Sequence, residues 1–220
     1  MTSRRASTKG KDAKRAQERK IPWFPLAVLV ILVLGAVAIA LAGGDDEAVE
    51  DGVNTAPVAV TGNPLPAFGG DPQNDPAVGA PAPAVEGRRI DGSPITIDPR
   101  ESGPMALVFL AHWCPHCQAE VTRVQRWLED NEPPDGVTLR AVSTLVEPSQ
   151  ANYPPAAWLQ REGWSVPTLA DDEASAAAEA FGLQGTPFWV FIDAQGEVSM
   201  RHAGELEIGP LESILENLAG

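Results

Sequence analysis

One stretch of the sequence decides the fold: residues 105–117, MALVFLAHWCPHC. Its first half, Met105–Leu110, is a continuous apolar run, which is typical of a strand buried in the middle of a sheet. The chain's two cysteines, Cys114 and Cys117, follow closely. Pro115 between them suits the first turn of a helix, where its missing N–H leaves no hydrogen bond unmade. The stretch therefore predicts a buried strand that turns, at a cysteine pair, into a helix.

The position of this cysteine pair has chemical consequences. A helix N-terminus presents unpaired N–H groups and a partial positive charge, which stabilise a thiolate at Cys114. Cys117 comes round one helical turn to meet it. Attack by the Cys114 thiolate on a disulfide, or by another thiolate on the Cys114 sulfur, gives a mixed disulfide that Cys117 resolves. The pattern indicates thiol–disulfide exchange, and Trp113 is expected beside the site, as part of it or as a structural residue.

Two other roles of a C-x-x-C pair are disfavoured. A zinc site normally needs four ligands, and the chain has no second cysteine pair. His112 and His116 lie too close in sequence to complete a tetrahedron easily. An inert structural disulfide would close so short a loop that it would constrain the unfolded chain little. We therefore expect no metal and no other cofactor.

Patterns downstream and upstream of the motif predict an α/β fold. Turn signals at Asp91-Gly92 and at 193–196 lie between apolar segments and indicate two hairpins. A second central strand is expected over 137–143. Helices are expected in four places: after Cys117, where Val121, Val124, Trp127 and Leu128 share a face; from Pro154 to near Gly163; over 173–181, ended by Gly182; and around Leu211–Leu218. This order predicts a mixed sheet with helices on both faces, preceded by a β-hairpin.

The N-terminal part of the sequence predicts a membrane anchor. Residues 1–20 hold eight of the 16 Lys and Arg, and residues 21–42 are an uncharged stretch. Such a stretch matches a bilayer core of about 30 Å at about 1.5 Å per residue. Basic residues before it and acidic ones after it place 1–20 in the cytoplasm of a bacterial cell as a basic tail, with the rest of the chain outside. The alternative is a signal peptide cleaved after Ala42; either way the domain that follows crosses the membrane.

The remainder of the chain divides into a linker and a domain. Residues 43–80 are rich in Gly, Pro, Asp, Asn and Ala without sustained apolar periodicity, so we expect a flexible linker that acts as a passive tether. The globular domain is expected over 81–220. Beyond residue 20 the chain has eight basic residues, all Arg, against 28 Asp and Glu. So acidic a body repels nucleic acid and disfavours DNA or RNA as partners.

The motif Trp113–Cys117 on a strand-to-helix turn, together with Gly185-Thr186-Pro187 before an apolar strand, resembles the thioredoxin superfamily. The chain is most similar to its TlpA/ResA-like, membrane-anchored branch, over roughly residues 78–218. The resemblance implies a thioredoxin-like fold in which Pro187 is cis and faces the cysteines. It also implies that Thr186 offers its backbone to an extended substrate strand.

Glu120 lies in the place where the TlpA/ResA branch often carries a functional glutamate. A buried carboxylate there could exchange protons with Cys117. By its sequence position alone, Glu120 is equally an ordinary solvated residue of the helix.

The sequence leaves two directions of electron flow open. His116 adds positive charge beside Cys114, which stabilises the thiolate and makes the disulfide a stronger oxidant. The dipeptide between the cysteines resembles that of DsbA-type oxidants, and Val108 replaces the buried acid that helps thioredoxins to reduce. In contrast, Glu120 and the TlpA/ResA resemblance imply reduction, for instance of apocytochrome c. We expect a slight preference for oxidation.

The expected function is that of an extracytoplasmic thiol–disulfide oxidoreductase. Its partners would be the thiols and disulfides of exported proteins, and a membrane redox partner that recycles the site. An alternative from another class is a copper-handling protein, because Cys114, Cys117 and His202 could supply soft and imidazole ligands. His202 itself is more simply interpreted as an exposed residue of a strand.

Overall fold

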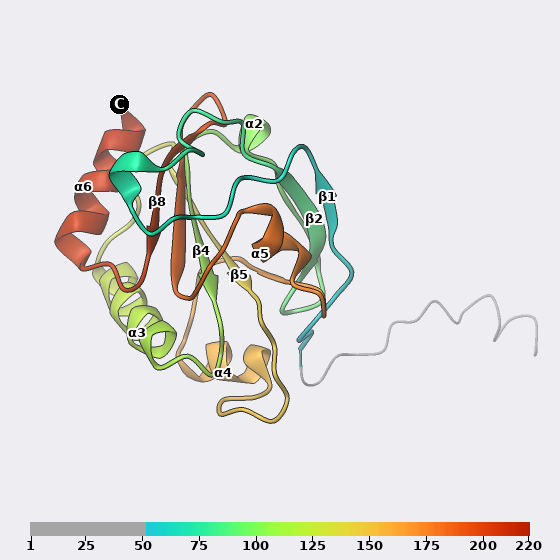
Figure 1. Cartoon of the computed structure of the whole chain (residues 1–220). Coiled ribbons are helices and arrows are strands. Elements are labelled where there is room, and N and C mark those ends of the chain that lie inside the picture. Colours follow the sequence, from blue (N-terminus) through green and yellow to red (C-terminus); the bar gives the residue numbers. More distant parts are fainter. Residues whose placement is uncertain (1–51) are drawn as a thin grey trace, which may run out of the picture. The chain divides into compact units, whose positions relative to one another are not determined.

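The apolar run at 105–110 lies at the centre of an eight-stranded mixed sheet in the computed structural model, which describes residues 52–220 (Figure 1). The strand order is β1-β2-β6-β5-β4-β7-β8, and β3 pairs with β2 outside this path. The strands are β1 (Ala59–Thr61), β2 (Ala84–Arg89), β3 (Pro94–Ile97), β4 (Met105–Leu110), β5 (Thr138–Ser143), β6 (Thr168–Ala170), β7 (Phe188–Ile192) and β8 (Val198–Ala203).

Strand β4 is buried along its whole length, as its continuous apolar sequence predicts. All six of its residues have no exposed surface. It runs parallel to β5 on one side and antiparallel to β7 on the other. Both faces of the strand are covered. A polar side chain on either face would therefore forfeit the stabilisation that burial of an apolar side chain gives the fold.

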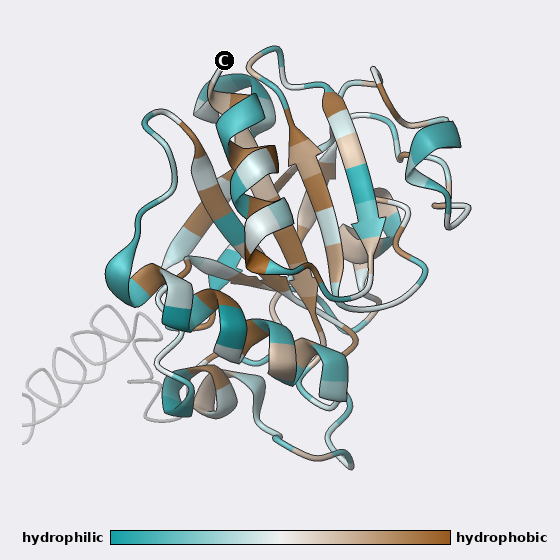
Figure 2. Cartoon of the chain, turned by 90° about the vertical axis from the view of Figure 1, so that its left-hand side faces the viewer, coloured by the Kyte–Doolittle hydropathy of each residue, from teal (hydrophilic) through white to brown (hydrophobic). Residues whose placement is uncertain are grey.

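Helices cover both faces of the sheet. Helices α3 and α6 lie side by side on one face, and α5 lies on the opposite one (Figures 1 and 2). In Figure 2 the hydrophilic sides of α3 and α6 face outward, above hydrophobic strands. The helical segments are η1 (Pro72–Asn74), α2 (Pro99–Ser102), α3 (Pro115–Asp130), α4 (Pro155–Arg161), α5 (Ala176–Ala180) and α6 (Ile208–Ala219). The predicted fold class and both predicted hairpins, β2–β3 and β7–β8, are confirmed.

Strand β6 and helix α5 are among the elements that differ from the prediction. The short strand β6 was not predicted, because three residues are too few to show a period. Helix α5 begins at Ala176 rather than at 173. The carboxylates of Asp171 and Asp172 accept the N–H groups of the three residues 176–178 at 2.9–3.1 Å, and so set the start of the helix.

The largest correction concerns the expected linker. Within 43–80, the described residues from 52 onward pack on the domain instead of forming a coil. Strand β1 pairs with β2, and Leu65, Phe68 and Ala77 are buried in the core on the α5 face. Gly182, with φ of 71°, lets the segment approach closely, since a Cβ there would collide with the carbonyl oxygen of Pro66.

A buried ion pair ties this N-terminal segment to the sheet. Arg201 of β8 donates to both carboxylate oxygens of Asp75, at 2.8 and 2.5 Å, and neither side chain is exposed. The same guanidinium donates to the carbonyl oxygens of Pro66 and Phe181, both at 2.9 Å. Three hydrogen bonds from this buried cation, to Asp75 and Pro66, fix the position of the segment. The domain therefore includes residues 52–80 and is not confined to 81–220.

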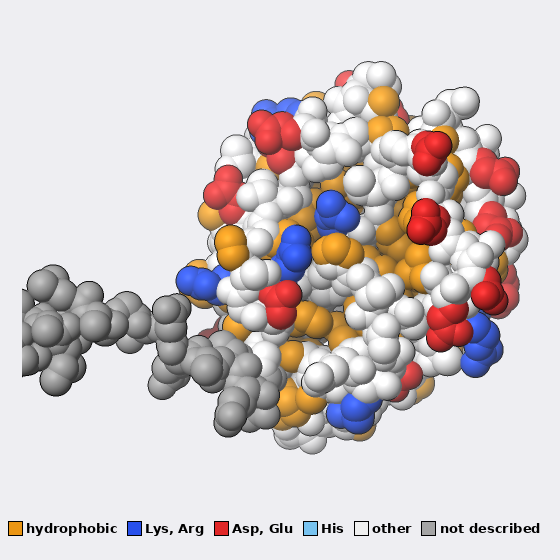
Figure 3. All heavy atoms as spheres, turned by 180° about the vertical axis from the view of Figure 1, so that it is seen from behind, with side chains coloured by type: hydrophobic (Ala, Val, Ile, Leu, Met, Phe, Trp, Pro, Cys, Tyr) orange, Lys and Arg blue, Asp and Glu red, His pale blue; other side chains and the backbone are white. Residues whose placement is uncertain are grey.

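The predicted cytoplasmic tail, 1–20, and membrane span, 21–42, lie outside the described residues. Among residues 52–220, no helix has the length and hydropathy needed to cross a membrane. Seen from behind, the domain shows Asp and Glu side chains along its right-hand edge (Figure 3). This surface fits the acidic composition of the chain after residue 20.

Candidate active site

Cys114 and Cys117 lie where β4 passes into α3. Cys114 is the N-cap residue of α3, with extended φ and ψ of −78° and 120°, and Pro115 is the first helical residue, as predicted. Cys114 retains 6% of its exposure, whereas Cys117 has none. Of the two sulfurs, the one at Cys114 is therefore the one that a partner protein can reach.

The two thiols also differ in their electrostatic surroundings. Burial raises the pKa of the Cys117 thiol to about 12, although the N–H of Ala111, 3.4 Å from its Sγ, acts in the opposite direction. Cys117 therefore stays protonated at neutral pH. The Cys114 sulfur lies at the N-terminus of a 16-residue helix, where the partial positive charge favours a thiolate. This asymmetry suits an attacking Cys114 and a resolving Cys117.

Thr186 and Pro187 lie opposite the cysteines, at the start of β7. The peptide bond between them is cis, as the family resemblance implied. The carbonyl oxygen of Thr186 is 3.3 Å from the Sγ of Cys114, although the two residues are 72 positions apart. Pro187 is buried, and its carbonyl accepts from the N–H of Gly204 at 2.8 Å. The structure thus brings both predicted substrate-binding residues to the redox motif.

Val108 belongs to the same buried cluster as Cys114 and Cys117. It has no exposed surface and pairs with Trp189 across the sheet. The interior side of the cysteine pair is therefore apolar at the position where a thioredoxin carries an acid. This lack of a polar group contributes to the high pKa of the buried thiol, because nothing at Val108 solvates its charged form.

Glu120 is buried rather than solvated, which decides between the two alternatives for its environment. Its oxygens accept from the indole N–H of Trp189 at 2.7 Å, from the N–H of Leu206 at 3.2 Å and from Arg123 at 2.7 Å. Burial raises the pKa of this carboxyl, against the opposing effect of these donors. The hydrogen bonds of Glu120 join α3 to β7 and to the loop after β8. None of them is to Cys117, the residue with which proton exchange was predicted.

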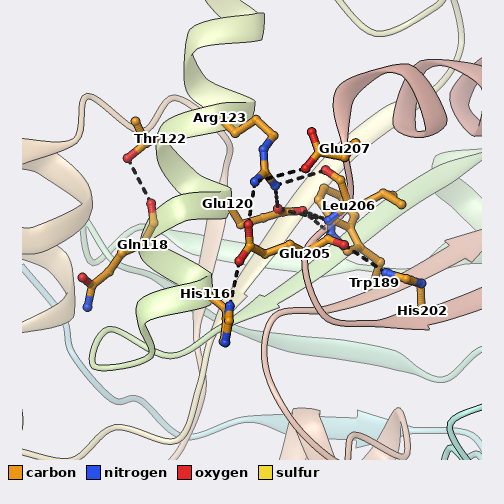
Figure 4. A network of polar contacts seen from close by, with 10 residues as sticks. All are labelled: His116, Gln118, Glu120, Thr122, Arg123, Trp189, His202, Glu205, Leu206 and Glu207. Carbon is orange, nitrogen blue, oxygen red and sulfur yellow. Dashed lines mark hydrogen bonds and ion pairs between the residues drawn. The ribbon is translucent and has the colours of Figure 1, made fainter.

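The His116 side chain is exposed, and it forms part of a network that the sequence did not reveal (Figure 4). Its Nδ1 lies 2.7 Å from an oxygen of Glu205, whose other oxygen accepts from Arg123 at 2.5 Å. Hydrogen bonds from His116 and then Arg123 lower the pKa of the Glu205 carboxyl. Arg123 in turn bonds Glu120, so one chain of charges runs from the redox motif to the buried carboxylate.

Trp113 is anchored beside the motif, with 36% of its surface exposed. Its indole N–H donates to the carbonyl oxygen of Leu145 at 2.8 Å. The neighbouring His112 is buried, and burial lowers the pKa of its ring. Its Nδ1 lies 2.7 Å from the carbonyl oxygen of Ala151, and its Nε2 accepts from the N–H of Glu147. Because a carbonyl only accepts and an amide N–H only donates, the ring is the neutral Nδ1–H tautomer.

The ligand set considered for copper is not assembled. Among residues 52–220, no group of three or more His, Cys, Asp or Glu side chains could hold a metal ion. His202 instead has its Nε2 3.1 Å from the carbonyl oxygen of Glu205, and it is partly buried in β8. The described residues therefore give the copper hypothesis no third ligand.

A sheet with β4 leading to a cysteine pair at the start of α3, and a cis-proline opposite, defines a thioredoxin-like protein. The family model for AhpC/TSA matches residues 78–201, and the chain belongs to this AhpC/TSA family. Membership covers the sheet from just before β2 into β8, including every residue of the redox motif.

Individual proteins agree with this assignment. The chain is 29% identical, over 107 residues, to the thiol:disulfide interchange protein DsbE of Pasteurella multocida, a match that covers 49% of this chain and 54% of that protein. The chain thus spans about half the length of this curated relative. The crystal structure of StoA from Bacillus subtilis is similar at a TM-score of 0.51 and 22% identity, over 63% of this chain and 98% of that one. The crystal structure of a DsbF homologue from Corynebacterium diphtheriae is similar at a TM-score of 0.52 and 17% identity, over 63% of this chain and 87% of that one. These two structural similarities concern the fold alone.

Proposed function

We propose that the chain is an extracytoplasmic thiol–disulfide oxidoreductase that exchanges disulfides with exported proteins through Cys114 and Cys117. The observation that carries the proposal is the pairing of an accessible sulfur at the N-cap of α3 with a buried one a single turn further on. The AhpC/TSA family and the similarity to a thiol:disulfide interchange protein support it. Residues 21–42 would hold the domain at the outer face of the membrane.

In the oxidising direction, a client thiolate attacks the Sγ of Cys114 in the disulfide form of the protein. The Cys114–Cys117 bond breaks, and its electron pair leaves on Cys117, which takes up a proton. A second client thiolate then attacks the client sulfur of the mixed disulfide, and Cys114 departs as a thiolate. The client loses two electrons, which the protein passes on to a membrane redox partner. The same steps run backwards reduce a client disulfide.

Net oxidation is the direction that we propose. The helix N-terminus and His116 both favour the Cys114 thiolate, which stabilises the reduced protein and makes its disulfide more oxidising. Val108 supplies no acid or base to the second cysteine. The alternative, a protein-disulfide reductase of the kind used on apocytochrome c, is favoured by one observation. Glu120 is buried in the position that the TlpA/ResA branch uses.

The reduction potential of the Cys114–Cys117 pair tests both the activity and its direction. It is measured by equilibration with glutathione and compared with thioredoxin at about −270 mV. We expect a more positive potential than that of thioredoxin, and no complete cycle of disulfide exchange when either cysteine is replaced by alanine. A potential at or below that of thioredoxin would support the reductase instead. Failure of the wild-type pair to exchange at all would overturn the proposed activity.

A further inference from the structure

A pocket lies directly beside the redox motif. It has a volume of about 420 Å³ and is lined by Trp113, by the loop 145–150 and by Glu173 and Ser175 ahead of α5. Trp113 is the residue before Cys114. Residues that flank the exchanged cysteine of a bound client are therefore the ones that we expect to meet this pocket.

The walls of the pocket are held in place. The indole of Trp113 is fixed to the carbonyl of Leu145. The ring of His112 bonds the backbone at Glu147, within the loop, and at Ala151, directly after it. Because His112 belongs to the same turn as the redox motif, these bonds fix the loop relative to Cys114. The pocket is thus preformed, which reduces the entropy that a client must lose on binding.

The charges on the rim are all negative. Glu147 and Glu173 are exposed, and among residues 52–220 no Arg forms an ion pair with either carboxylate. The chain has no Lys after residue 20. His112, the nearest basic group along the loop, is the neutral tautomer because both of its nitrogens are engaged as described. Within the described part of the chain, no positively charged residue lines the pocket to offset the two carboxylates, although Oε1 of Glu147 accepts from the N–H and the hydroxyl of Ser149 at 3.3 and 2.9 Å.

Three apolar residues, Trp113, Leu145 and Val146, line the pocket together with the two carboxylates, and Gln150 and Ser175 complete the lining. Such a combination fits a long side chain that has an apolar stem and a cationic end. The face of an indole also attracts a cation that lies over it. An acidic side chain would meet repulsion from both carboxylates and would gain nothing from the indole.

We propose that this pocket selects clients that carry arginine or lysine next to the cysteine that is exchanged. The inference rests on the proposed thiol–disulfide exchange and adds its substrate preference. Two carboxylates on a solvent-exposed rim produce a moderate preference that salt weakens. We expect basic peptides to react about tenfold faster than acidic ones at low ionic strength, by the magnitude of such exposed interactions.

The test uses the full-length, reduced protein in a neutral detergent. The probes are single-cysteine peptides in which the cysteine is disulfide-bonded to thionitrobenzoate, with Arg, Ala or Glu placed at each flanking position in turn. Attack by Cys114 releases the coloured thiol, and Cys117 then releases the peptide, so the rate is read by absorbance. Each rate is divided by the rate of the same protein with the small, uncharged reagent 4,4′-dithiodipyridine.

The variant Glu147→Gln/Glu173→Gln should bring the Arg and Glu peptides to nearly equal normalised rates. The matched control, Glu129→Gln/Glu216→Gln, removes the same charge from exposed residues that do not line the pocket, and it should keep the wild-type preference. Equal rates for all peptides in the wild type, or loss of the preference in the control, would overturn this inference. A wild-type protein that does not react with dithiodipyridine would instead overturn the proposed exchange activity itself.

Discussion

An oxygen of Glu205 lies 2.7 Å from the Nδ1 of His116, although 89 positions separate the two residues in the sequence. Glu205 follows β8, and His116 lies between the two cysteines at the start of α3. His116, the basic residue of the redox motif, therefore has an acidic partner. Arg123 donates to the second carboxylate oxygen of Glu205 and so holds Glu205 in place.

Replacement of Glu205 by glutamine should make the protein more oxidising. The change removes a negative charge close to the Cys114 thiolate, so the reduced form gains stability. Because Glu205 is near the surface, we expect a rise of roughly 10–20 mV, where about 30 mV corresponds to a tenfold change in the exchange equilibrium. Equilibration with glutathione measures it. Glu216→Gln on α6 is the control and should leave the potential where it is.

His116→Ala should move the potential in the opposite direction, by tens of millivolts. The imidazole is the partner of Glu205, so its loss also leaves that carboxylate without its contact on the motif side. In the double variant His116→Ala/Glu205→Gln, the two shifts should partly cancel. A potential that His116→Ala does not change would show that the dipeptide between the cysteines has no part in setting the direction of exchange.

Cys117→Ala should accumulate mixed disulfides with client proteins, and Cys114→Ala should not. The reason is the different burial of the two sulfurs: Cys114 is reachable, while burial raises the pKa of Cys117 to about 12 and keeps it a thiol. The complexes are counted on non-reducing gels after alkylation of free thiols in cell extracts. Equal trapping by both variants would contradict the assignment of Cys114 as the attacking residue.

The redox site was predictable from the sequence because its signals are local. An apolar run of strand length, a C-x-x-C pair and a proline in the first turn all fall within residues 105–117. Thr186-Pro187 was recognised through the family resemblance rather than through any pattern of its own. Glu120 could only be named as a candidate, since its burial depends on Trp189 and on the loop after β8, far away in the chain.

The segment 52–80 was mistaken for a linker because its contacts are long-range and isolated. Leu65, Phe68 and Ala77 are single apolar residues among prolines and glycines, so they give no period. All three are buried in the core on the α5 face by contacts with distant parts of the chain, and β1 spans only three residues. The pairing of Glu205 with His116 was hidden for the same reason, because it depends on where the loop between β8 and α6 lies against α3.

The topology of the chain can be tested in cells. The basic residues 1–20 and the uncharged residues 21–42 predict that residues 43–220 face outside and stay bound to the membrane. A C-terminal tag should therefore be found in the membrane fraction and be accessible to protease from the outer side. Soluble tagged protein of full length would contradict the prediction. A shortened soluble form would indicate cleavage after Ala42.

The buried pair of Asp75 and Arg201 should dominate the attachment of the N-terminal segment. Asp75→Asn leaves the Arg201 charge without a counter-ion in a site with no exposure. We expect a loss of about 3–5 kcal/mol in the free energy of unfolding at pH 7, the usual cost of breaking a buried pair. Urea unfolding followed by tryptophan fluorescence measures it. The double variant Asp75→Asn/Arg201→Met should lose less than the two single losses added together.

The same pair predicts a pH dependence with a definite sign. Burial would raise the pKa of Asp75, but the hydrogen bonds and charge of Arg201, with the N–H of Ala77, outweigh it and lower the pKa below its usual value. A carboxyl whose pKa is lower in the folded state than in the unfolded state stabilises the fold above the unfolded value, and loses this contribution as the pH falls through the folded one. The difference in stability between wild type and Asp75→Asn should therefore be constant above about pH 5 and shrink below about pH 4. A difference that stays constant down to the acid unfolding of the wild type would contradict a lower pKa of Asp75 in the folded state than in the unfolded state.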